Sequence, residues 1–101
     1  MNTMDYRKII EILKEEHFKE VKNEGDWLEE GTVIFAKEIK KDIFLLFIIL
    51  HDTPIDTMRA LIAHFDSFNC IGKKEPLQLM FYLSIKDEED FHYFKKYTTH
   101  Q

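Results

Sequence analysis

The feature that most constrains the fold of this chain is a run of eight large apolar residues at positions 43–50. The run has no polar face, so it cannot lie on the surface of a protein, and its β-branched and aromatic residues favour a strand over a helix. Polar residues flank it at positions 40–42 and 51–53. The sequence therefore predicts a strand that is covered on both faces and lies in the middle of a sheet.

The length and composition of the chain predict one globular domain spanning residues 1–101. Hydrophobic residues make up 45% of the chain and charged residues 33%, which is typical of a folded soluble protein. The longest apolar run is far shorter than the roughly 20 residues that cross a membrane. Cys70 is the only cysteine, and the first residues do not resemble a secretory signal. We therefore expect a cytoplasmic protein without a membrane segment.

Two elements are predicted before the apolar run. Thr3 or Asp5 can cap a first helix that runs to about Asn23. Apolar residues recur within it at helical spacing, and Gly25 follows as a stop signal. The pattern changes to a period of two at residues 32–40, which predicts a strand that forms a hairpin with residues 43–50. Residues 27–30 allow a short extra edge strand.

Three elements are predicted after the apolar run. Thr53 and Pro54 are suited to begin a helix, and apolar residues at helical spacing continue it to Phe68. Residues 77–85 alternate between a fully apolar and a mixed face, which predicts a third strand. An acidic turn at residues 87–90 and a basic turn at residues 95–96 then favour a final helix, because both suit the helix dipole.

These elements predict an α+β, sandwich-like fold with the order α-β-β-α-β-α. A right-handed crossover through the helix near residues 53–68 would make residues 43–50 and 77–85 parallel neighbours. The result is a three-stranded mixed sheet with residues 43–50 as its central strand. The chain has 14% aromatic residues, and if the helices cover one face of the sheet too thinly, we expect the excess to be buried in a homodimer.

The negative charge is confined to one part of the chain. Residues 11–30 contain eight acidic and three basic residues, which accounts for the whole net charge of −5. Such a surface attracts a basic partner and offers no basic stripe for nucleic acid. Trp27 stands among these acids and suits an interface anchor. The candidate protein-binding residues are Glu15, Glu16, Glu20, Glu24, Asp26, Trp27, Glu29 and Glu30.

The sequence therefore favours a small acidic interaction or regulatory module without catalytic activity. Its partner would be a protein with a basic surface or a second copy of the chain. Inhibitors of the immunity type and accessory proteins of mobile elements have this size and charge. No cofactor and no metal site are predicted, because the five histidines lack the local spacing of zinc ligands.

Two alternatives remain open at this point. Asp26, Glu38 and Lys40 resemble the acid–acid–lysine core of restriction-endonuclease-like nucleases, in which two carboxylates hold a divalent metal beside a lysine. The resemblance implies a small metal-dependent nuclease. Alternatively, His51 and Asp52 follow the predicted central strand, where open α/β sheets bind ligands, so they are candidates for a ligand site.

Overall fold

The computed structural model describes residues 6–25, 28–29, 31–50 and 57–99. In chain order, its elements are helix α1 (Tyr6–Glu15), strands β1 (Lys19–Lys22), β2 (Thr32–Lys40), β3 (Ile43–Leu50) and β4 (Thr57–His64), the short 3-10 helix η1 (Phe68–Cys70), strand β5 (Gln78–Ile85) and helix α2 (Glu88–Thr99). The strands form one antiparallel sheet in the order β1-β2-β3-β4-β5, so each strand pairs with its neighbours in the sequence.

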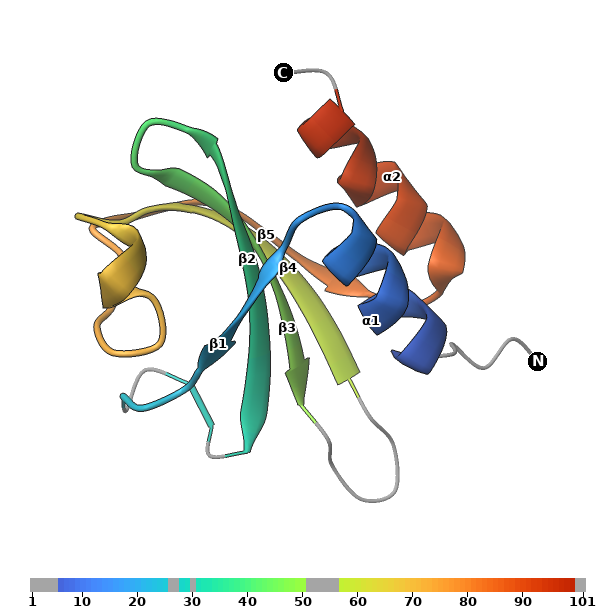
Figure 1. Ribbon diagram of the computed structural model, residues 1–101, viewed down its shortest axis with the longest axis horizontal. Coiled ribbons are helices and arrows are strands. Elements are labelled where there is room, and N and C mark those ends of the chain that lie inside the picture. Colours follow the sequence, from blue (N-terminus) through green and yellow to red (C-terminus); the bar gives the residue numbers. More distant parts are fainter. Residues whose placement is uncertain (1–5, 26–27, 30, 51–56, 100–101) are drawn as a thin grey trace.

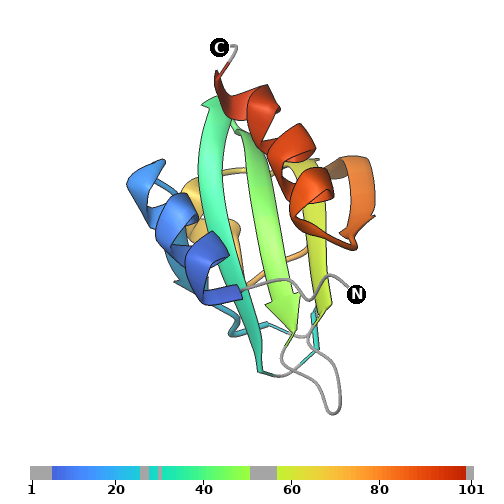
Figure 2. The same cartoon turned by 90° about the vertical axis from the view of Figure 1, so that its right-hand side faces the viewer.

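The molecule has three layers (Figure 1). The two helices lie on one side of the twisted sheet, and the segment that contains η1 lies on the other side. Figure 2 looks onto the helix-covered face, with β1 at one edge of the sheet and β5 at the other. The sheet therefore has two apolar faces, and the helices cover one of them while the η1 segment covers the other.

Each face of the sheet contributes to a separate apolar core. On the helix side, Phe47 is fully buried, and its ring lies 5.5 Å from that of Phe18, 5.2 Å from that of Phe91 and 6.3 Å from that of Phe94. On the other side, Phe44 packs against the rings of Phe65 and Phe68. Successive residues of β3 point into opposite cores, which is why this strand has no polar face.

The prediction of a three-stranded mixed sheet with the element order α-β-β-α-β-α was wrong. The structure has the order α-β-β-β-β-β-α, with five antiparallel strands and no crossover. The predicted hairpin is confirmed, because β2 and β3 pair in antiparallel fashion, and so is the central place of residues 43–50. The fold is α+β.

The main error concerns residues 57–64, which were predicted as helix and form β4. Met58 and Ala60 point into the core on the helix side, whereas Leu61 and Ala63 point into the other core. A strand buried on both faces has apolar residues at nearly every position, so some of them also fall at helical spacing. The apolar spacing that predicted a helix therefore arose because this strand is buried on both faces.

The first helix is shorter than predicted, because it ends at Glu15 and not near Asn23. His17 has a φ of 70°, a left-handed conformation that reverses the chain direction after the helix. Phe18 is then buried on the helix side, and the next four residues form β1. Leu28 and Glu29, the described part of the predicted extra strand at residues 27–30, lie outside any strand.

The third predicted strand and the final helix have the expected bounds within a few residues. However, residues 78–85 form β5, which pairs with β4 in antiparallel fashion and not with the central strand in parallel. Phe91 and Phe94 of α2 are buried. The change in pairing places β5 at the end of the sheet.

Two loops meet at Gly72, just before β5. Its carbonyl oxygen accepts hydrogen bonds from the backbone N–H groups of Glu24 (2.6 Å) and Gly25 (2.7 Å). Gly72 has a φ of +84°, and a Cβ atom there would collide with the carbonyl oxygen of Lys22. Glycine is therefore required at this position by both the backbone conformation and the close approach of the loops.

Candidate functional site

The two edges of the sheet differ in a way that bears on binding. β1 has four residues, Lys-Glu-Val-Lys, and three of them are charged. β5 has eight residues and no charge. Short strands and charged side chains are the usual protection of a sheet edge against pairing with other chains, whereas long apolar edges promote such pairing. Among the described strands, β1 is therefore the short and charged edge, and β5 is the long edge without charge.

Large apolar side chains are exposed around β5. Among the residues that the structure describes, all six exposed large hydrophobic residues lie on β5, directly before it, or on α2, with exposed fractions between 46% and 61%. We call this set the β5 surface: Leu77, Leu79, Met80, Phe81, Tyr82 and Tyr93. Large apolar side chains that are exposed together on a small protein often mark a binding site.

The exposure of each β5 side chain depends on whether a neighbouring element packs over that part of the strand. On the helix side, Ile85 is buried, Leu83 is half-buried and Phe81 is exposed, because α2 begins just after β5 and packs over that end of the strand. The ring of Phe81 touches that of Phe94 at 5.3 Å between centroids. On the other side, Tyr82 pairs with Leu61 but remains half exposed.

A register shift in β5 accentuates this exposure. Phe81 pairs with Ile62, and Leu79 pairs with Ala63, so Met80 has no partner residue on β4. Such a bulge changes which way the following side chains point. The bulge lies within a run of four consecutive exposed residues with large side chains, 79–82.

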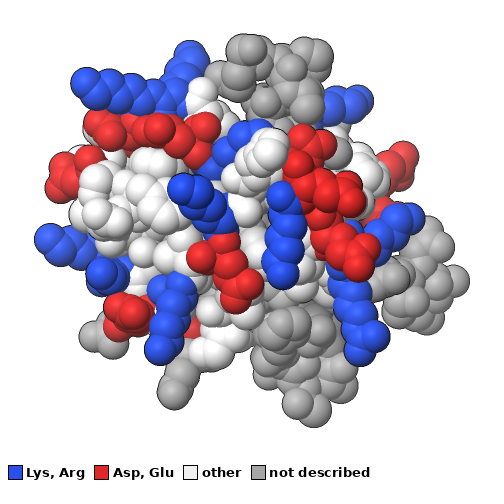
Figure 3. Space-filling model, in the orientation of Figure 1, with Lys and Arg blue, Asp and Glu red and all other residues white. Residues whose placement is uncertain are grey.

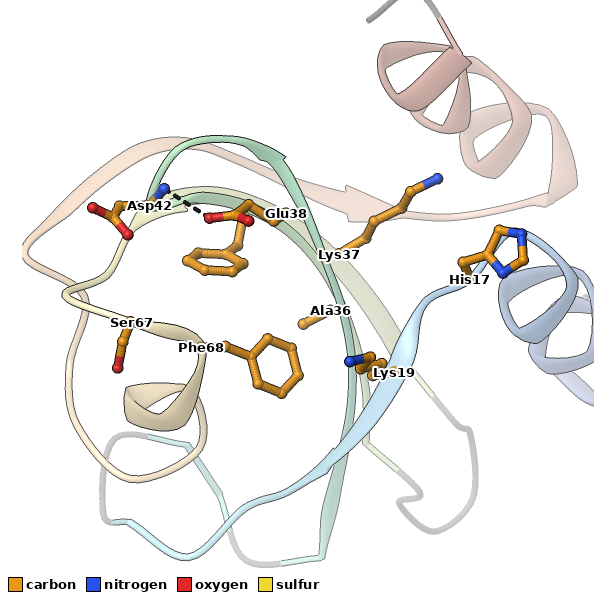
Figure 4. A pocket seen from close by; sticks show the side chains of 9 residues that line it. His17, Lys19, Ala36, Lys37, Glu38, Asp42, Ser67 and Phe68 are labelled. Atoms are coloured by element: carbon orange, nitrogen blue, oxygen red, sulfur yellow. Dashed lines mark hydrogen bonds between the residues drawn. The ribbon is translucent and has the colours of Figure 1, made fainter.

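A separate open pocket of about 310 Å³ lies between β2 and the η1 segment. Figure 4 shows Phe68 and Lys19 directed into it, whereas Lys37 extends away toward His17. The ammonium group of Lys19 lies 5.5 Å from the centre of the Phe68 ring. The lining mixes positive, negative and aromatic side chains, so the pocket has no single chemical preference.

The predicted acidic site is distributed over several elements. Glu15 lies on α1 and Glu20 on β1, and both are exposed, as is Glu24 after β1. Glu16 is half-buried. Asp26, Trp27 and Glu30 lie outside the described residues. On the face shown in Figure 3, acidic and basic side chains are interspersed, so the negative charge in the sequence does not form a uniform acidic surface there.

Glu29, another member of the predicted acidic set, has a partner of its own. Its carboxylate accepts a hydrogen bond from the Arg59 guanidinium of β4 at 3.2 Å. A backbone hydrogen bond at Glu29 itself, and then Arg59, lower the pKa of the carboxyl group. This ion pair ties the β1–β2 loop to the sheet and occupies a carboxylate that was predicted to bind a partner.

The lowered pKa of Glu29 has a testable consequence. We expect Arg59→Gln to move the pKa of Glu29 upward, but not fully to the usual value, because the backbone hydrogen bond remains. The contribution of this pair to stability is present above the unfolded-state pKa and is lost as the pH falls through the folded-state pKa. It should be small, since the Glu29 side chain is 53% exposed. An NMR titration of the side-chain carboxyl carbon measures the shift.

The exposed Lys41 provides the control for this titration. Lys41→Gln removes the same charge without touching Glu29, so the pKa of Glu29 should stay as in the wild type. An equal pKa in the wild type and the Arg59→Gln variant would contradict the assignment of Arg59 as a cause.

The two enzyme-like alternatives gain no support from the described residues. The Glu38 carboxylate accepts a hydrogen bond from the backbone N–H of Asp42 at 2.9 Å and so closes the β2–β3 turn. Lys40 is exposed at the same turn, and Asp26 lies outside the described part of the chain. His51 and Asp52 also lie outside it. Their prediction as a ligand site assumed a parallel crossover, and the antiparallel pairing of β3 with β4 removes that premise.

Within the described ranges, no group of three or more His, Cys, Asp or Glu side chains is placed to hold a metal ion. No described helix has the length and apolar character needed to cross a membrane.

The sequence signal that could have identified the β5 surface is an eight-residue strand pattern without any charge, at residues 78–85.

The chain was compared with protein-family models, with curated proteins and with solved structures. None of the three comparisons found a match.

Proposed function

We propose that this protein is a protein-binding module whose binding element is the outer edge of β5. The observation that carries the proposal is the β5 surface, a long uncharged edge strand with exposed apolar side chains. The partner would be an extended polypeptide segment that adds a strand to the sheet. A binding role in the cytoplasm, in place of a catalytic one, is part of this proposal.

The chemistry of the partner follows from the two kinds of group that β5 offers. A strand at the end of a sheet presents backbone N–H and C=O groups along its outer side, and these pair with any extended chain. The side chains add selectivity: Phe81 lies on the helix side of the sheet and Tyr82 on the other side. A segment with apolar residues on both faces, and without charge in its middle, would therefore bind best.

In-cell photo-crosslinking tests this proposal without knowledge of the partner. We expect a photoreactive phenylalanine derivative in place of Tyr82 to give defined crosslinked protein products in the native cell. Tyr82 is suited because it is half exposed and the replacement keeps an aromatic ring. The products are identified by mass spectrometry.

Glu20 is the matched control position, because it is exposed on β1 at the opposite edge of the sheet and belongs to the predicted acidic site. The same replacement at Glu20 should give no defined product. Crosslinks from Glu20 without any from Tyr82 would move binding to the acidic residues and overturn the proposal, and so would the absence of products at both positions.

A further inference from the structure

We draw no further inference here: the strongest candidate, the uncharged outer edge of β5 with the exposed apolar side chains around it, belongs to the site already described, and nothing in the described part of the chain shows what covers it.

Discussion

Replacement of Phe47 by alanine is expected to reduce the free energy of unfolding by about 4 kcal/mol, a value typical of fully buried phenylalanines. Phe47 is inaccessible to solvent in the middle of the central strand, and its ring contacts those of Phe18, Phe91 and Phe94. Its removal leaves a cavity between the sheet and the residues that cover it. Denaturant unfolding monitored by circular dichroism measures the loss.

Phe68 is the matched control for this substitution. It is also a phenylalanine, but it is half-buried in η1 on the other side of the sheet, where it contacts Phe44. Phe68→Ala should cost about 1 kcal/mol, because only part of the ring is removed from water. Equal losses for the two variants would contradict the central role of the Phe47 cluster.

The second large effect is expected at Gly72. Gly72→Ala should reduce the free energy of unfolding by about 3 kcal/mol, since it combines an unfavourable backbone conformation with a steric clash. The added Cβ meets the Lys22 carbonyl oxygen and forces the β1–β2 loop away from the segment before β5. The hydrogen bonds from Glu24 and Gly25 to Gly72 would be strained in the same movement.

Gly31 separates the two parts of this effect. Its φ of +85° is nearly the same as that of Gly72, but nothing lies within 4 Å of the position of an added Cβ. Gly31→Ala should therefore cost only the conformational part, about 1 kcal/mol. If the two alanine variants were equally stable in thermal unfolding, the steric clash at Gly72 would make no contribution to the loss of stability.

The sequence predicted those elements whose pattern had one interpretation. Residues 43–50 could only be a strand buried on both faces, and the acidic start of the last helix is visible in the chain itself. The position of β4 could not be obtained in this way. Its apolar residues fit a helical stripe and a doubly buried strand equally well, and only packing between the two cores decides between them.

The β5 surface was missed because exposure is a property of the whole sheet. The alternation in residues 77–85 predicts a strand, and it also suggests that its apolar face is covered. Whether the cover reaches Phe81 depends on where α2 packs, and whether β5 has a second neighbour depends on the strand order. The acidic residues, in contrast, are prominent in the sequence but are dispersed over α1, β1 and a loop once the chain is folded.

The order of the strands also bears on how the protein is made. Since every strand pairs with the strand before it in the chain, the sheet can grow from β1 toward β5 in step with synthesis from the N-terminus. β5 is the last of the described strands in chain order, and α2, which covers one end of it, follows directly. The uncharged edge of β5 is thus formed only after strands β1 to β4 have been made.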